Sequence, residues 1–294
     1  MLNRLTTEMR NPKSAEIDTL PVRDRLLLMN DEDAGVAAAV RSEIDQIESA
    51  VNLVVQAFQN GGRLIYAGAG TSGRLGILDA SECPPTFGVD PAMVRGLIAG
   101  GERAITTAIE GAEDDEGLGR SDLEALSPDP RDVVIGIAAS GRTPYVIGAL
   151  EKAKEAGAKT VAVSNNKDSK IGQAADVAIE VVTGPEIITG STRLKAGTAQ
   201  KLVLNMITTI AMTGIGKVYG NLMVDVQPTN QKLIERAKHI IMEATGCDAS
   251  TAKEMYEKAD GQVKTAIVMI LLGCSYEEAV GQLEKSKGII REIN

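Results

Sequence analysis

Three glycines in the motif GAGTSG have a spacing that suits phosphate binding. Gly68, Gly70 and Gly73 form the pattern G-x-G-x-x-G between a β-forming run and a predicted helix. Such a loop presents free backbone N–H groups and the positive end of a helix dipole to an anion. A dinucleotide site also needs an acidic residue about 20 residues further on, at the end of the second strand. The second predicted strand, MVRGLIAG, ends at Gly100 and is followed by Gly101 instead, so the motif favours a phosphate ligand that is not a dinucleotide.

Hydroxyl-rich segments recur at three places along the chain. The glycine loop contains TSGR, the third predicted strand ends in the similar SGRT, and TGSTRLKAGTAQK begins another predicted helix. Because parallel strands bind ligands at their shared carboxyl edge, we expect these segments to form a cage for one phosphate and several sugar hydroxyls. The candidate binding residues are Gly70, Thr71, Ser72, Arg74, Ser140, Gly141, Arg142, Thr143, Ser191, Thr192 and Lys195. On any one loop, the serines and threonines are equally explained as helix caps and turn residues; their repetition favours binding.

Short apolar runs alternate with helical segments through the middle of the chain. Five runs are typical of buried strands: RLIYAGAG, MVRGLIAG, DVVIGIAAS, KTVAVSN and VAIEVV. The intervening TPYVIGALEKAKEAGA has helical periodicity, with Pro144 in its first turn and Gly157 as its expected C-cap. This alternation predicts parallel strands joined by right-handed crossovers, hence a three-layer α/β sandwich with a five-stranded parallel sheet, over residues 45–225.

The two ends of the chain are predicted to be different. Residues 1–44 form an arm and the start of a helix, which Gly61 and Gly62 end. Residues 226–294 form a C-terminal helical module containing three short helices, the last opening with the capping box of Ser275 and Glu278. Apolar residues at helical spacing mark the N-terminal helix: Val36, Val40, Ile44, Ile47, Val51, Val54 and Val55.

The composition argues against several classes of partner. The chain has 294 residues, a net charge of −9 and 2% aromatic residues, which argues against a nucleic acid or an anionic membrane as partner. The N-terminal sequence lacks the apolar core of a signal peptide and no run is long enough to span a membrane, so a cytoplasmic protein is expected. Three widely spaced cysteines and a single histidine give little support for disulfides or a metal site.

Several blocks of the sequence together resemble one family. The loops GAGTSGR and ASGRTP are similar to those of sugar isomerase (SIS) domains. The blocks TEMRNP, LDASECPPTFG, AGGERAITTAIEGAEDD and TGSTRLKAGTAQK resemble the N-acetylmuramic acid 6-phosphate etherases, a family within that superfamily. The resemblance runs from the N-terminal arm through the helical tail.

This resemblance implies the fold and the activity. The fold would be an SIS domain at residues 45–225 followed by a helical, UBA-like module at residues 226–294. The protein would be a cytoplasmic, homodimeric lyase of amino-sugar metabolism and peptidoglycan recycling. It would cleave the D-lactyl ether of N-acetylmuramic acid 6-phosphate to give N-acetylglucosamine 6-phosphate and D-lactate, without metal or nucleotide cofactor.

The family motifs also imply the catalytic residues. They correspond here to Glu82 of ASECPP and Glu113 of GAEDD. By analogy, Glu113 removes the proton at C2 of the open-chain sugar and Glu82 protonates the departing lactyl oxygen, after which water adds at C3 by the reverse steps. The residues themselves leave the division of these roles open. Four basic residues are candidate counter-charges for the phosphate and the lactyl carboxylate: Arg74, Arg142, Arg193 and Lys195.

Without the family motif, the sequence gives some support to Glu82 as a catalytic carboxylate and none to Glu113. Glu82 follows an apolar segment that should pack as a helix, and the rigid pair Pro84-Pro85 comes after it. Partial burial at that helix end would favour a protonated carboxyl, whereas a solvated helix end would not. Glu113 belongs to the acidic run EGAEDDEG, which is typical of a solvated loop, so only the motif singles it out.

A cysteine nucleophile has weaker support. Cys83 has only one possible histidine partner, His239, which lies far along the chain on a predicted amphipathic helix. A packing or interface role is therefore expected for His239, and a contribution to a neighbouring subunit's site stays open.

Two other functions remain alternatives at this point. An aldose-ketose isomerase would use the same fold, phosphate cage and C2 base, but would act on a sugar without the lactyl ether. A sugar-phosphate sensor would bind without turnover, although the acidic chain lacks the basic footprint of a DNA-binding regulator.

Overall fold

The computed structural model describes residues 5–226 and 231–293. The chain divides into two compact units. The first comprises Met1–Ser81 and Ala92–Thr208, and the second comprises Glu82–Pro91 and Thr209–Asn294. We describe each unit by itself.

The first unit is built on a five-stranded sheet in which every pairing is parallel and the strand order is β2-β1-β3-β4-β5. All five predicted strands are confirmed. They are β1 (Leu64–Gly68), β2 (Val94–Ile98), β3 (Val133–Ala138), β4 (Lys159–Ser164) and β5 (Val177–Glu180). Every residue of β1 and β3 is buried, as expected for central strands covered on both faces.

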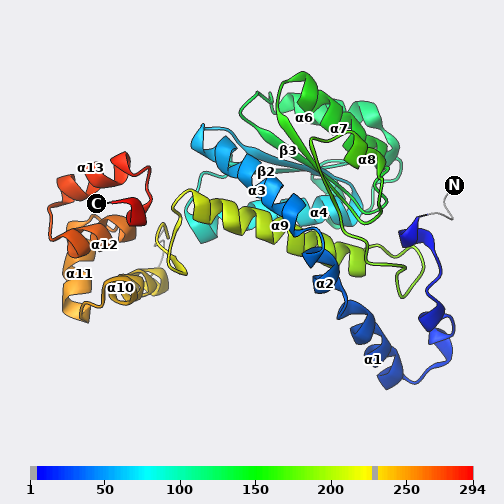
Figure 1. Cartoon of the computed structure of the whole chain (residues 1–294), viewed down its shortest axis with the longest axis horizontal. Coiled ribbons are helices and arrows are strands. Elements are labelled where there is room, and N and C mark those ends of the chain that lie inside the picture. Colours follow the sequence, from blue (N-terminus) through cyan, green and yellow to red (C-terminus); the bar gives the residue numbers. More distant parts are fainter. Residues whose placement is uncertain (1–4, 227–230, 294) are drawn as a thin grey trace. The chain divides into compact units, whose positions relative to one another are not determined.

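Helices cover both faces of this sheet, as Figure 1 shows. Ile65 of β1 and Val134 of β3 pack with Val146 and Leu150 of α7 on one face. On the opposite face, a Cβ at Gly76 of α4 would lie 2.9 Å from the Cβ of Tyr66. Helices α6 (Glu116–Ala125), α7 (Pro144–Glu155) and α8 (Lys170–Gln173) lie on the first face, and α3 (Ile44–Gln59), α4 (Gly70–Phe87) and α9 (Lys195–Gly214) on the other. The unit is therefore the predicted three-layer sandwich; its remaining α-helices are α1 (Val22–Asp33), α2 (Val36–Arg41) and α5 (Arg103–Thr106).

The helix after the N-terminal arm is interrupted. Instead of one continuous helix up to the glycine pair, α2 ends at Arg41 and α3 begins at Ile44. The break turns Glu43 inward, where its carboxylate pairs with Lys167 and accepts a hydrogen bond from the backbone N–H of Glu180 at 3.3 Å. Ile44, at the start of α3, is consequently on the exposed side.

A buried polar cluster fixes α4 against the sheet and against α9. The Tyr66 hydroxyl donates to Asp79 Oδ2 at 2.8 Å, and the Thr208 hydroxyl donates to Asp79 Oδ1 at 3.2 Å. Burial raises the pKa of Asp79, although both hydrogen bonds favour its charged form. The helix that follows the glycine loop is thus held by a specific interaction and not by apolar packing alone.

The second unit contains a small hairpin and a helical module. The hairpin pairs β6 (Val218–Tyr219) with β7 (Leu222–Met223). The helices are α10 (Gln231–Thr245), α11 (Ala249–Lys258), α12 (Val263–Leu272) and α13 (Tyr276–Lys285). The predicted capping box is present: Ser275 Oγ accepts from the Glu278 N–H at 3.3 Å, and Glu278 Oε2 accepts from the Ser275 N–H at 2.8 Å. The three short helices and their breaks are therefore confirmed.

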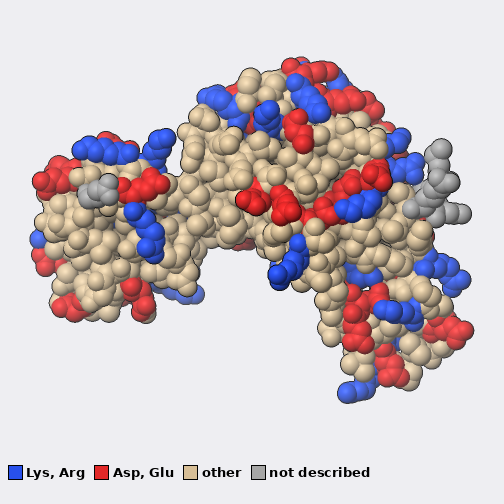
Figure 2. All heavy atoms as spheres, in the orientation of Figure 1, with Lys and Arg blue, Asp and Glu red and all other residues tan. Residues whose placement is uncertain are grey.

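Acidic and basic side chains are interspersed over the face drawn in Figure 2. Within the described ranges, no single helix is long and apolar enough to cross a membrane. The pair α12 and α13 passes the same test of length and composition together, but the two helices are bent by 103° at their break.

Candidate functional site

The junction between β1 and α4 shows why the glycines are needed. A Cβ at Gly73 would lie 2.6 Å from Ile98 Cγ1 and 2.8 Å from the carbonyl oxygen of Gly68, so a larger residue there would push the helix off the sheet. Gly70 has φ of +54°, and a Cβ there would meet no atom of the described chain within 4 Å, so its backbone turns in open space. The glycine spacing therefore brings the start of α4 close to the strand and leaves its first turn accessible.

A cavity of about 160 Å³ lies at this junction. It brings together three of the predicted site residues, Gly70, Arg74 and Glu113. Arg74 is fixed by donating from Nε to the carbonyl oxygen of Ile105 at 2.8 Å. The other lining residues are Ala69, Ala99, Ala104, Thr107, Ala108, Ile109, Glu110 and Gly111. The cavity thus combines a cation, a carboxylate and the start of a helix, which are kinds of group that can bind an anion and move a proton.

The second predicted binding loop follows β3, the strand next to β1 in the sheet. Because β1 is flanked by β2 on one side and β3 on the other, the connections after β1 and β3 leave in opposite directions, and ligands bind at such a switch point. Gly141 has φ of +69°, and a Cβ there would lie 2.4 Å from Ser169 Cβ. Ser140 Oγ accepts from the backbone N–H of Arg142 at 3.3 Å, so one predicted binding residue also shapes its own turn. Arg142 and Thr143 are half-buried.

The two hydroxyl residues at the start of α4 differ in their surroundings. Ser72 is buried and donates to Gln200 Oε1 at 2.9 Å, and Gln200 in turn donates to Asn165 Oδ1 at 3.1 Å. Thr71 is half-buried, and its Cγ2 lies 3.4 Å from where a Cβ at Gly197 on α9 would stand. Ser72 therefore connects the first predicted segment to the third through Gln200 of α9, and Thr71 of the first segment lies close to Gly197 of the third.

At the start of α9, the first backbone N–H groups find a hydrogen-bond acceptor within the protein itself. Glu186 is fully buried, and its two carboxylate oxygens accept from the backbone N–H groups of Lys195 at 3.0 Å and Ala196 at 2.9 Å. The Lys195 ammonium donates to Glu32 Oε2 of α1 at 2.6 Å, with the two side chains only 5% and 9% exposed. Lys195, predicted as a counter-charge for the substrate, is thus engaged in an internal ion pair. Ser191 and Thr192 are half-buried and Arg193 is exposed.

Sequence reasoning missed the role of the N-terminal arm. The backbone N–H of Thr6 donates to Asn166 Oδ1 at 2.8 Å, and Asn166 Nδ2 donates to Thr7 Oγ1 at 3.1 Å and to the carbonyl oxygen of Ala139 at 3.0 Å. The arm therefore packs at the carboxyl edge, next to the residue that precedes Ser140. In the sequence, only the family resemblance of the block TEMRNP could have indicated that the arm lies near the site.

The two candidate catalytic carboxylates are both exposed. Glu113 is the middle residue of a short 3-10 helix, Ala112–Asp114, whose N-cap is Gly111. It lines the cavity described above. Glu82 belongs to the second unit, whereas Glu113 belongs to the first. The helix end expected before the proline pair is wrong, because α4 continues through Pro84 and Pro85 to Phe87. The partial burial considered for Glu82 is also absent from the described chain, since Cys83 occupies the buried side of the helix instead.

His239 does not pack inside the chain. Its side chain is 70% exposed on α10, with Nδ1 3.8 Å from Glu243 Oε1, because Ala237 and Ile241 occupy the buried face of that helix. An interface role stays a prediction. Among the residues that the structure describes, no group of three or more His, Cys, Asp or Glu side chains is placed to hold a metal ion.

Comparisons with known proteins agree with the fold. The description "Glucokinase regulatory protein N-terminal SIS domain" matches residues 46–154, and "SIS domain" matches residues 119–210. The solved phosphoheptose isomerase from Neisseria gonorrhoeae has a TM-score of 0.50 at 19% identity, covering 66% of this chain and 100% of that one, a likeness of fold alone. The parallel sheet with its hydroxyl-rich loops defines an SIS-domain protein.

Full-length relatives narrow this class. N-acetylmuramic acid 6-phosphate etherase from Shouchella clausii is 62% identical over 292 residues, which cover 99% of each chain. The protein of the same name from Oceanobacillus iheyensis is 60% identical over the same length and coverage. The chain therefore belongs to the N-acetylmuramic acid 6-phosphate etherase family, and it is an enzyme.

Proposed function

We propose that this chain cleaves the D-lactyl ether of N-acetylmuramic acid 6-phosphate and releases N-acetylglucosamine 6-phosphate and D-lactate. The observation that carries the proposal is the identity of about 60% with etherases over almost the whole chain. The cavity that brings Gly70, Arg74 and Glu113 together supports it, because it joins an anion-binding helix start to a carboxylate that can act as a base.

The chemistry follows from the acidity of the hydrogen next to a carbonyl. In the open-chain sugar, C2 lies between the aldehyde at C1 and the ether-bearing C3. A base takes the C2 proton, the electron pair forms the C2–C3 double bond, and the C3–O bond breaks as the lactyl oxygen gains a proton. Water then adds to C3 while C2 regains a proton, so the overall change consumes one water and needs neither metal nor nucleotide.

We assign the two proton transfers to the two carboxylates of the family motifs. Glu113 acts as the base at C2, since it lies in the same cavity as Gly70 and Arg74, where the phosphorylated sugar is expected to bind. Glu82 acts as the acid at the lactyl oxygen and later as the base that activates water. Two positioned carboxylates can each contribute roughly 100- to 10,000-fold to such a reaction.

Binding of the sugar is assigned to the carboxyl edge of the sheet. The accessible start of α4 and the Arg74 guanidinium bind the phosphate, because both favour a dianion. The loop after β3 and the segment before α9 contribute sugar contacts through Thr71, Ser140, Gly141, Arg142, Thr143, Ser191 and Thr192. Ser72 and Lys195 support these loops from within, through Gln200 and Glu32.

The biological setting follows from the same relationship. We propose that the protein acts in the cytoplasm as a homodimer in peptidoglycan recycling and amino-sugar catabolism. Its acidic net charge of −9 disfavours nucleic acids and anionic membranes as partners.

Product analysis in deuterated water tests this proposal. The protein is incubated with N-acetylmuramic acid 6-phosphate, and the products are identified by mass spectrometry. We expect D-lactate and N-acetylglucosamine 6-phosphate carrying one non-exchanging deuterium, at C2. Binding without lactate release would leave the sensor alternative. Conversion of N-acetylglucosamine 6-phosphate to a ketose, with the muramic acid substrate untouched, would leave the isomerase.

A further inference from the structure

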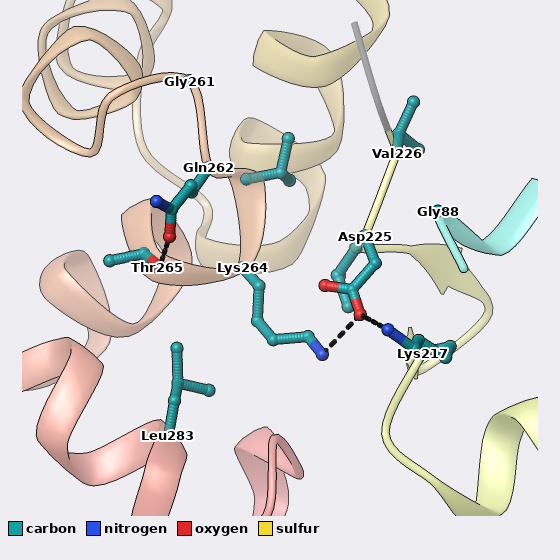
Figure 3. A pocket seen from close by; sticks show the side chains of 11 residues that line it. Gly88, Lys217, Asp225, Val226, Gly261, Gln262, Lys264, Thr265 and Leu283 are labelled. Atoms are coloured by element: carbon teal, nitrogen blue, oxygen red, sulfur yellow. Dashed lines mark hydrogen bonds and ion pairs between the residues drawn. The ribbon is translucent and has the colours of Figure 1, made fainter. Parts of the chain in front are cut away.

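Two lysines in the second unit share a single carboxylate. Lys217, between α9 and β6, and Lys264, in the first turn of α12, each place Nζ 2.8 Å from Asp225 Oδ2 (Figure 3). The three side chains are 22%, 12% and 19% exposed, respectively. They come from three separate segments of the unit, so the fold itself brings the cluster together.

This cluster carries an excess of positive charge. Both ammonium groups approach the same carboxylate oxygen, and one carboxylate neutralises only one of them. Burial, and to a smaller extent the charge of Lys217, lower the pKa of Lys264 against the raising effect of Asp225. A second negative charge at this position would relieve the repulsion between the two lysines.

The cluster lies on the wall of a cavity of about 450 Å³. The first turn of α12 forms another part of the wall. Within the described residues, the backbone N–H groups of Val263, Lys264 and Thr265 have no hydrogen-bond acceptor, and the N-cap Gln262 makes no side-chain cap. The Gln262 Oε1 instead accepts from the Thr265 hydroxyl at 2.9 Å. The positive end of a ten-residue helix thus adds to the charge of the lysines.

The rest of the wall is apolar. It is formed by Val224, Val226 and Leu283 beside the backbone of Gly88 and Gly261. The volume exceeds what a bare phosphate group needs, so the carbon part of a small metabolite fits beside the charged end. None of the lining residues belongs to the cavity of Gly70, Arg74 and Glu113.

We propose that this cavity is a second anion site, which binds a small phosphate monoester through Lys217, Lys264 and the first turn of α12. A phosphate monoester is favoured over a carboxylate because its three terminal oxygens can accept from both lysines and from backbone N–H groups together. Asp225 competes with the ligand for the lysines and limits its affinity. The site takes part in neither proton transfer of the proposed etherase reaction.

Equilibrium dialysis of the full chain with labelled inorganic phosphate tests this site. The measurements are made in an Arg74→Gln background, which weakens phosphate binding at the other cavity. We expect one remaining site. Lys217→Gln and Lys264→Gln should each weaken its affinity by at least about tenfold, since each removes a charge in contact with the ligand. Lys258→Gln, at an exposed lysine paired with Glu254, is the matched control and should leave the affinity unchanged.

The removal of the competing carboxylate gives the more decisive result. Asp225→Asn should strengthen phosphate binding several-fold, a gain that a poorly folded protein cannot produce. If phosphate binding in the Arg74→Gln background is absent, or unchanged by the lysine substitutions, the proposal is wrong. If Asp225→Asn weakens binding as the lysine substitutions do, the three residues are a structural ion cluster and no anion site.

Discussion

The starts of α4 and α9 carry similar sequences but are built differently. Both have serine, threonine and a basic residue near a helix N-terminus. At α4, Gly70 lies in open space and Arg74 lines a cavity with Glu113. At α9, the carboxylate of Glu186 occupies the first backbone N–H groups, and Glu32 binds Lys195.

The difference shows what decides whether a helix start binds a ligand or stabilises the fold. A helix start binds an external anion only where the protein supplies no acid of its own. Glu186 stands 9 residues before Lys195, and Glu32 stands 163 residues before it. We therefore expect changes at α4 to affect catalysis and changes at α9 to affect stability.

The largest expected effect is at the carboxylate of the α4 cavity. Glu113→Gln should lower kcat by roughly 100- to 10,000-fold, because the amide cannot take the C2 proton. The free energy of unfolding should change by less than about 0.5 kcal/mol, since Glu113 is exposed. Steady-state kinetics measure the loss of kcat, and chemical denaturation measures the change in the free energy of unfolding. The neighbouring exposed Asp114 provides the control: Asp114→Asn should keep near wild-type activity.

The second prediction concerns the stability of the α9 start. The ion pairs with Lys13 and Lys195 lower the pKa of Glu32 to about 2. Because the folded pKa lies below the unfolded value of about 4.5, the stabilisation is present above pH 4.5 and is lost as the pH falls toward 2. Glu32→Gln should therefore cost roughly 3 kcal/mol at pH 7.

Urea denaturation at several pH values measures this effect. The stability difference between wild type and Glu32→Gln should shrink steadily below pH 4.5. A difference that stays constant down to pH 2 would show that the Glu32 carboxylate contributes through packing and not through its charge.

Arg74 supplies the positive charge of the α4 cavity. Arg74→Gln should lower kcat/KM by roughly 10- to 100-fold, as expected for the loss of a charge-assisted hydrogen bond to phosphate. Stability should change little, in contrast to Glu32→Gln. Competition with inorganic phosphate should weaken in parallel; an unchanged inhibition constant for phosphate would place the phosphate elsewhere.

The smallest predicted effect is at the cap of α9. Glu186→Gln keeps one acceptor oxygen but removes the negative charge at the helix N-terminus. It should cost about 1–2 kcal/mol of unfolding free energy, with KM for the substrate nearly unchanged. A large rise in KM with normal stability would mean that the α9 start binds substrate directly, and would end the distinction between the two helix starts.

The sequence predicted the fold well because its signals are local. Each of the five strands is a short apolar run, and Gly157 and the Ser275 capping box mark helix ends through neighbouring residues. The break between α2 and α3 was missed, because Glu43 turns inward to reach Lys167 and the backbone of Glu180, both distant in sequence.

The site could be predicted only in part. The glycine spacing reflects a local backbone requirement, because Gly73 lets the helix approach the strand closely and Gly70 adopts a positive φ. The ion pair of Lys195 has no local signal, since a lysine at a helix start looks the same whether its partner is a ligand or Glu32. The continuation of α4 through Pro84 and Pro85 also goes against the local rule that prolines end helices.

The most direct test of the central claim is proton exchange at C2 of N-acetylmuramic acid 6-phosphate in deuterated water, compared between Glu82→Gln and Glu113→Gln. If Glu113 is the base and Glu82 the acid, the Glu82 variant should place deuterium at C2 of the unreacted substrate while lactate release is strongly slowed. The Glu113 variant should do neither. Deuterium uptake that persists in Glu113→Gln and disappears in Glu82→Gln would contradict the assignment and reverse the two roles.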